Sequence, residues 1–138
     1  MTSSGNDGMG AGKKINFPAD AKDILTVGSI NEQGTNAAFS AVGPTADGRI
    51  KPDVMAYGSP TCVITGRGSI INDNGTSFSS PLIAGMVACL WQALPRKTAK
   101  QMIKLVRLAG NNQQHPDNVF GYGVPDFWKA YQTGKAIK

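Results

Sequence analysis

The sequence has little of several features that specialised proteins depend on. Its 138 residues include one histidine and two cysteines. Two cysteines are too few for a disulfide framework, and the carboxylates show no ligand spacing, so we expect no metal site and no cofactor. No run of eighteen apolar residues occurs, which excludes a membrane-spanning helix of ordinary length. Residues 1–8 lack the basic head and apolar stretch of a signal peptide, so the sequence gives no localisation.

The residues that are present have an ordinary globular composition. Apolar residues make up 41% of the chain, and its length fits one domain with a core. Seventeen glycines and eight prolines indicate more tight turns than a helical bundle uses. Cys89 lies in the most apolar segment, and we expect it to be a small buried thiol. Whether it pairs with Cys62 is left open, because pairing depends on geometry.

The net charge of +5 raises the question of an acidic partner. Five basic residues follow one another along a predicted helix and its start: Arg96, Lys97, Lys100, Lys104 and Arg107. Such a stripe could bind nucleic acid or an anionic surface. The solvated outer face of an amphipathic helix is the favoured interpretation, because no aromatic platform or nucleic-acid motif accompanies it. We therefore expect no nucleic-acid partner and no membrane partner.

The order of apolar runs and turn signals predicts an alternating α/β chain. Residues 1–12 contain four glycines and are predicted to be a loop. Strands are expected at Ile24–Ile30, Ala37–Ser40, Asp53–Ala56 and Thr61–Thr65. Helices are expected from about Ser77 to Leu94, from the capping box at Thr98 to about Ala109, and from Pro125 to Ala130 or Tyr131, with a frayed tail at 133–138. Because the first helix is apolar nearly all round, we expect it to be buried.

The segment Gly75–Pro81 carries the strongest chemical signal. It places Ser77 where a loop ends and a helix begins. Unpaired backbone N–H groups and the helix dipole favour negative charge there, which suits a serine nucleophile that forms an oxyanion. Taken alone, a helix-capping serine is the simpler interpretation.

Several segments in order resemble the subtilisin-like serine proteases, or subtilases. Gly75–Pro81 resembles the nucleophile motif of that family, and Ser4–Gly8 resembles its Gly-Asn oxyanion loop. Phe17–Ala19 is similar to a turn that lines the substrate cleft. Three further segments match framework signatures: Phe39–Pro44, Lys51–Ala56 and Gly121–Asp126. The resemblance covers about residues 4–132 and is far more specific than any one motif.

The resemblance implies an α/β fold, part of a subtilisin-like three-layer parallel-sheet domain. The family carries its catalytic Asp and His before the asparagine loop, so residues 1–138 correspond to a partial catalytic domain that lacks the N-terminal half. One residue departs from the pattern. Tyr57 stands where the family has proline before Gly58, which leaves the shape of that turn open.

The resemblance also implies roles for individual residues. Ser77 is the expected nucleophile, and Asn6 is the expected oxyanion-hole donor. Five residues are expected to bind substrate: Ser4, Gly5, Phe17, Pro18 and Thr76. His115 lies in a polar loop and is expected to be solvated rather than catalytic. Asp53 is expected to make structural hydrogen bonds.

Two functions follow. The first is a serine endopeptidase as the parent activity, with this chain inactive alone because it lacks the family's Asp and His. The second is a catalytically inactive module that associates with a complementing N-terminal half or with itself. An esterase using Ser77 and His115 is disfavoured, because Ser77 is not in a Gly-x-Ser-x-Gly elbow. The parent family is largely exported, acts on peptides or proteins and is expected to need no cofactor here.

Overall fold

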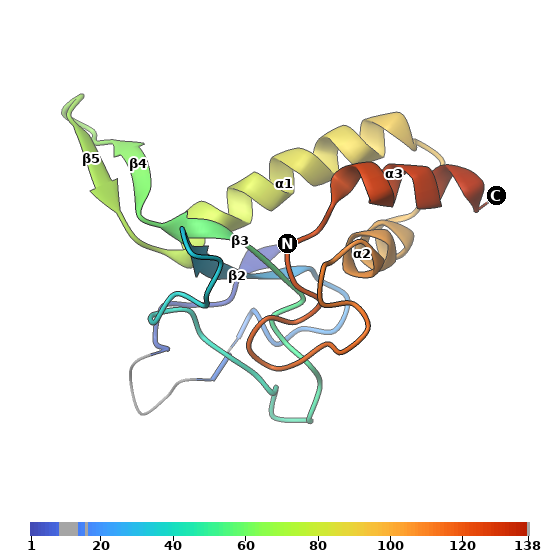
Figure 1. Cartoon of the computed structure of the whole chain (residues 1–138), viewed down its shortest axis with the longest axis horizontal. Coiled ribbons are helices and arrows are strands. Elements are labelled where there is room, and N and C mark those ends of the chain that lie inside the picture. Colours follow the sequence, from blue (N-terminus) through green and yellow to red (C-terminus); the bar gives the residue numbers. More distant parts are fainter. Residues whose placement is uncertain (9–13, 16, 138) are drawn as a thin grey trace.

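The computed structural model describes residues 1–8, 14–15 and 17–137. It is an α/β arrangement in which three helices pack around a small parallel sheet (Figure 1). The strands are β1 (Thr2–Ser3), β2 (Thr26–Asn31), β3 (Val54–Ser59), β4 (Thr61–Ile64) and β5 (Ile70–Asp73). The helices are α1 (Thr76–Ala93), α2 (Ala99–Leu108) and α3 (Phe127–Ala136).

The central sheet has the order β1-β2-β3, with both pairs parallel. Thr26 pairs with Thr2 on one side, and Val27 pairs with Val54 on the other. Both valines are fully buried. Parallel strands are covered on both faces, which is why the predicted strand near Ile24–Ile30 is an almost continuous apolar run. The sequence did not predict β1, which adds a two-residue strand inside the expected loop; residues 9–12 of that loop lie outside the described residues.

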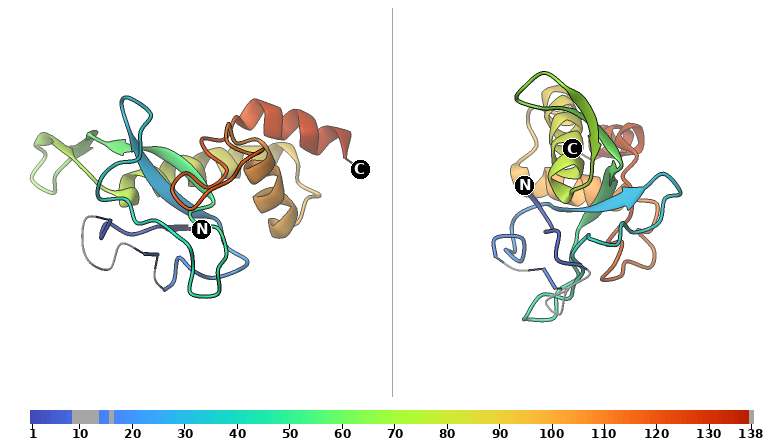
Figure 2. Two further views of the ribbon diagram at one scale, coloured as in Figure 1. Left: turned by 60° about the horizontal axis from the view of Figure 1, so that its bottom comes forward. Right: turned by 90° about the vertical axis from the view of Figure 1, so that its left-hand side faces the viewer.

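Helix α1 packs on β2 and β3, and α2 and α3 lie beside its C-terminal half (Figures 1 and 2). The core between them holds Leu25, Val27, Val54, Ala56, Ile83, Leu90, Met102, Leu105, Val106, Ala109 and Ala130. Four of these residues come from α2 or directly follow it, because Met102, Leu105, Val106 and Ala109 recur at helical spacing. The predicted capping box is confirmed: Thr98 Oγ1 accepts from Gln101 N–H, and Gln101 Oε1 accepts from Thr98 N–H at 2.8 Å.

Strands β4 and β5 form an antiparallel hairpin that projects from the body of the molecule beside the start of α1 (Figure 1). The predicted strand at Thr61–Thr65 is found as β4, whereas β5 was not predicted. Its isoleucines are exposed, Ile70 by 71%, so no buried face marks the strand in the sequence.

The expectation that α1 is buried nearly all round is wrong. Thr76, Ser79, Ile83 and Leu90 are buried, but Leu82 is 51% exposed and Met86 46% exposed. Cys89 on the same helix is also exposed, contrary to the expectation of a buried thiol. The reason is that the described sheet and helices cover one side of α1 and leave its other apolar side open.

Two further expectations differ from the structure. Ala37–Ser40 is a turn rather than a strand, closed by a hydrogen bond from Ser40 N–H to the Ala37 carbonyl at 2.8 Å. Helix α3 continues to Ala136, beyond the predicted end at Ala130 or Tyr131. The added turn packs closely, since a Cβ on Gly134 would lie 2.4 Å from the Leu94 side chain. None of the helices within the described ranges has the length and hydropathy needed to cross a membrane.

Candidate active site

The beginning of α1 is fixed by a backbone contact with β3. Gly75 immediately precedes the helix, and its N–H donates to the carbonyl of Gly58 at 3.0 Å. Thr76 is the first helical residue and is buried, and Ser77 is the second and is exposed. The predicted helix start at Thr76 or Ser77 is therefore confirmed, and the Ser77 side chain faces solvent at the helix N-terminus.

Tyr57 does not disturb this region. β3 continues through Tyr57 to Ser59, and Tyr57 pairs with Ile30 of β2. Its hydroxyl lies 3.4 Å from a Glu32 carboxylate oxygen. The strand therefore delivers Gly58 to the start of α1 although tyrosine replaces the usual proline.

Asn6 reaches the same point from the beginning of the chain. Its Oδ1 accepts from the N–H of Thr76 at 3.0 Å and from Oγ1 of Thr76 at 2.8 Å. A backbone N–H can only donate, so the side-chain oxygen must face Thr76. The Nδ2 group is thereby turned to the other side, and a Cβ on Gly75 would lie 3.5 Å from it. Asn6 thus presents an amide donor beside the start of α1.

The backbone N–H of Ser77 is a second donor in this region. The first N–H groups of a helix have no intrahelical acceptor. The N–H of Thr76 donates to Asn6, and the N–H of Phe78 donates to the Gly75 carbonyl at 3.1 Å. The N–H of Ser77 has no acceptor among the described residues. The positive end of the α1 dipole adds to the attraction for negative charge.

Four of the predicted substrate-binding residues line one hollow. Ser4, Gly5, Phe17 and Pro18 surround a space of about 200 Å³ that also touches Thr2, Ser3, Asp7, Lys14, Ala19 and Ala41. Phe17 is 88% exposed, whereas Ser4 is buried with its hydroxyl 3.5 Å from that of Ser40. Thr76, the fifth residue, lies apart from this hollow and contacts Asn6 instead. The sequence did not point to Lys14, which belongs to no matched motif, or to Ala41, which lies in the matched framework segment Phe39–Pro44 but was given no substrate-binding role.

His115 is not brought to Ser77. It is exposed in the loop between α2 and α3, where its N–H donates to the Asn112 carbonyl at 3.2 Å. It shares no described pocket or hydrogen bond with the serine. Within the described ranges no group of three or more His, Cys, Asp or Glu residues could hold a metal ion.

Asp53 lies in a buried charge cluster rather than at the candidate site. Its Oδ2 accepts from Lys51 Nζ at 2.7 Å and from Thr26 N–H at 2.6 Å, and its Oδ1 accepts from Arg107 at 2.5 Å. Burial lowers the pKa of Lys51, and the nearby Asp53 carboxylate opposes that effect. The cluster ties β2, the start of β3 and α2 together, which is the structural role that the sequence suggested.

These features describe a recognisable class of protein. Helix α1 packs on a parallel sheet and exposes a serine, Ser77, at its N-terminus. The side-chain amide of Asn6, from a loop distant in the sequence, lies beside this helix N-terminus. This is the arrangement of a subtilisin-like fold. The chain belongs to the subtilase family, whose profile matches residues 1–123.

Two curated relatives illustrate the similarity. The chain is 37% identical to subtilisin-like protease SBT6.1 of Arabidopsis thaliana, over 99% of this chain and 14% of that protein. It is 32% identical to the membrane-bound transcription factor site-1 protease of Mus musculus, over 100% of this chain and 14% of that protein. The chain therefore spans about 14% of the length of these relatives.

Solved structures show the same fold. The self-cleaved protease domain of PatA matches with a TM-score of 0.77 at 21% identity, over 97% of this chain and 49% of that one. MycP1 from the ESX-1 type VII secretion system matches with a TM-score of 0.64 at 29% identity, over 78% of this chain and 30% of that one. The predicted fold class is thus confirmed, and the chain covers only part of the domain.

Proposed function

We propose that this chain carries the nucleophile and the oxyanion hole of a serine endopeptidase. The observation that carries the proposal is the orientation of Asn6. Two donors of Thr76 hold its Oδ1, so its Nδ2 is available beside the start of α1. Ser77 Oγ, Ser77 N–H and Asn6 Nδ2 then supply a nucleophile and two oxyanion donors.

In the proposed reaction Ser77 Oγ attacks the carbonyl carbon of a peptide bond. Its proton passes to a histidine base, which later gives it to the leaving amine. The carbonyl oxygen becomes an oxyanion that accepts from Asn6 Nδ2 and Ser77 N–H. Collapse of this intermediate forms the acyl-enzyme, which water hydrolyses. The only histidine of this sequence, His115, is not near Ser77, so the base and its aspartate must come from residues outside this chain.

The substrate is proposed to be a peptide or protein. The hollow lined by Ser4, Gly5, Phe17 and Pro18 supports this, because it adjoins the loop that carries Asn6. A side chain of the substrate would enter the hollow against the exposed ring of Phe17.

Labelling with a fluorophosphonate, which reacts with activated serines, tests the proposal. The chain is treated alone and after mixing with a polypeptide that carries the family's Asp and His segments. We expect labelling only in the mixture, and none with Ser77→Ala. In subtilisin, loss of one oxyanion-hole donor costs about 3 kcal/mol, and we expect a similar loss in peptide hydrolysis for Asn6→Ala in the mixture. Labelling that survives Ser77→Ala would contradict the proposal.

The exposed side of α1 favours a second candidate, a module that acts by association. Leu82 and Met86 are four residues apart on one face of the helix and are exposed by 51% and 46%. Apolar groups gathered in this way mark an interaction surface. The proposed partner is a complementing N-terminal half or a second copy of the chain. Tight assembly measured by light scattering, reduced by Met86→Lys and not accompanied by serine labelling, would favour the module over the enzyme.

A further inference from the structure

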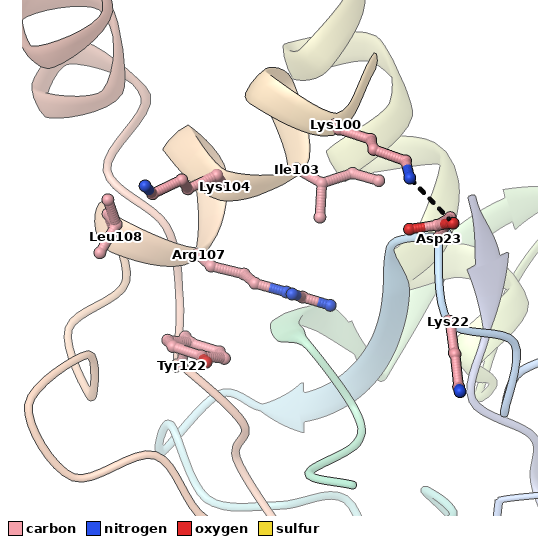
Figure 3. Close-up of a pocket in the computed structure, with 8 residues that line it drawn as sticks. All are labelled: Lys22, Asp23, Lys100, Ile103, Lys104, Arg107, Leu108 and Tyr122. Atoms are coloured by element: carbon pink, nitrogen blue, oxygen red, sulfur yellow. Dashed lines mark ion pairs between the residues drawn. The ribbon is translucent and has the colours of Figure 1, made fainter. Parts of the chain in front are cut away.

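We propose that a basic hollow beside α2 binds the phosphate group of a small molecule. The hollow has a volume of about 330 Å³ and lies between α2, the segment that precedes β2 and Tyr122 (Figure 3). It is lined by Lys22, Asp23, Lys100, Ile103, Lys104, Arg107, Leu108 and Tyr122. Helix α2 lies near the C-terminal half of α1, whereas Ser77 is at the opposite end of that helix, so the two sites are separate (Figure 1).

Arg107 is the central group of this basic hollow. Its guanidinium lies between Tyr122 and the Asp23–Lys100 pair (Figure 3). It stacks 5.7 Å from the centre of the Tyr122 ring, and its Nη2 is held by Asp53 at 2.5 Å. The side chain as a whole is 29% exposed, whereas its Nε is buried and has no hydrogen-bond partner among the described residues. A fixed and partly exposed guanidinium is well suited to recognise a phosphate.

The buried cluster behind Arg107 leaves positive charge unneutralised. Asp53 is the single carboxylate that pairs with both Lys51 and Arg107. Burial is the main reason why the pKa of Lys51 is lowered, and the Arg107 charge lowers it further. An anion bound at the exposed face of Arg107 would offset this surplus.

The side chains at the rim of the basic hollow carry more positive than negative charges. Lys104 and Lys22 stand at opposite sides of it, and Lys100 pairs with Asp23 at 3.3 Å (Figure 3). Asp23 is the only acidic residue of the lining, against three lysines and Arg107. The field in the hollow therefore attracts a multiply charged anion rather than a cation.

The shape of the site favours a small ligand over a nucleic acid. Lys22, Lys100, Lys104 and Arg107 line one hollow, and Lys22 comes from outside α2. Arg107 lies over one face of the Tyr122 ring, so that face offers no platform for a base. Ile103 and the 37% exposed Leu108 supply an apolar wall, which fits an organic body attached to the phosphate.

Titration calorimetry on the 138-residue chain tests the site, with inorganic phosphate and phenyl phosphate as probes at constant ionic strength. We expect saturable binding of both, with phenyl phosphate tighter because its ring contacts Ile103 and Leu108. Equal affinity of the two probes would overturn the claim that the site binds an organic group attached to the phosphate, and would indicate a site for free phosphate. The absence of saturable binding by either probe would overturn the whole proposal.

Charge variants separate this site from general surface attraction. Lys104→Gln removes a charge from the basic hollow, and we expect it to raise the dissociation constant roughly two- to fivefold. Lys129→Gln is the matched control, because Lys129 is exposed on α3 and does not line the hollow. We expect Lys129→Gln to leave the affinity unchanged. An equal effect of the two variants would show that the anion responds only to net charge.

Discussion

The carbonyl oxygen of Gly58 accepts a hydrogen bond from the N–H of Gly75 at 3.0 Å, so the end of β3 touches the start of α1 backbone to backbone. No side chain could stand between them. A Cβ on Gly58 would lie 2.3 Å from Ser79 Oγ, 2.6 Å from Ser29 Oγ and 2.7 Å from the Gly75 carbonyl oxygen. Since Gly75 is followed directly by Thr76 and Ser77, this contact sets where the candidate nucleophile is held.

The close approach at Gly58 predicts that Gly58→Ala is destabilising. The added methyl group would push against the backbone of Gly75, and overpacking of this kind costs about 1–3 kcal/mol. Gly85→Ala is the matched control, because a Cβ at Gly85 meets nothing within 4 Å. In a helix interior that change should stabilise by about 0.5–1 kcal/mol. Urea unfolding of both variants measures the difference, and equal stabilities would contradict the prediction.

The contact between Thr76 and Asn6 predicts the effect of Thr76→Val. Valine keeps the volume of the buried side chain but removes the Oγ1 donor that holds Asn6 Oδ1 at 2.8 Å. A neutral hydrogen bond contributes about 0.5–1.5 kcal/mol, so the melting temperature should fall modestly. In the complemented enzyme, peptide hydrolysis should fall less than for Asn6→Ala, because Thr76 N–H still holds the amide. Thr35→Val, at an exposed position, is the control, and a larger loss for that variant would argue against the Thr76 contact.

Asp53→Asn should be among the most destabilising single substitutions in the chain. It leaves Lys51 without its carboxylate in a site where that side chain is 1% exposed. Removing one partner of a buried ion pair costs about 3–5 kcal/mol. Asp23→Asn breaks an exposed pair with Lys100 and should cost at most about 1 kcal/mol. Chemical denaturation compares the two, and similar losses would mean that the buried cluster does not hold β2, β3 and α2 together.

The carboxylate of Asp47 should titrate unusually low. The Arg49 guanidinium, followed by the Thr45 hydroxyl, lowers the pKa of Asp47 from 3.8 to about 2. Because the folded-state pKa lies below the unfolded one, the stabilisation is fully present above pH 3.8 and is lost as the pH falls toward 2. Carbon-detected NMR of the carboxyl group measures the midpoint. Arg49→Gln should move it toward 3.8, and an unchanged midpoint would assign the shift to another cause.

The parts of the fold that follow from local chemistry were predictable. Thr98 and Gln101 carry their own capping signal, and both ends of that signal lie within one turn of α2. The start of α1 follows equally from Gly75 and Pro81, since proline is tolerated only in the opening turns of a helix. Parts that depend on distant neighbours were not predictable. β1 is two residues long and exists because Thr2 and Ser3 pair with β2. The exposure of Leu82 depends on which elements pack on α1, and the apolar pattern of the helix does not tell which they are.

The candidate site also has parts that follow from local sequence and parts that depend on distant residues. A serine at a helix start can be found from the sequence, because the motif and the helix signals are adjacent. No local pattern connects Asn6 with the start of α1. The ordered resemblance to subtilases linked Asn6 with Ser77, but it did not predict the hydrogen bonds between Asn6 and Thr76. The basic stripe on α2 was interpreted as a solvated face. That interpretation did not anticipate that Lys104 and Arg107 would share a hollow with Lys22, which precedes β2.

The hydrogen bonds between Asn6 and Thr76 also have a consequence for synthesis on the ribosome. The two residues are 70 positions apart, so at typical translation rates they emerge roughly 4 to 14 seconds apart. During that interval the asparagine amide has no threonine to orient it, and the serine does not yet exist. The contact between Asn6 and Thr76 can therefore form only after the segment that begins α1 has been made.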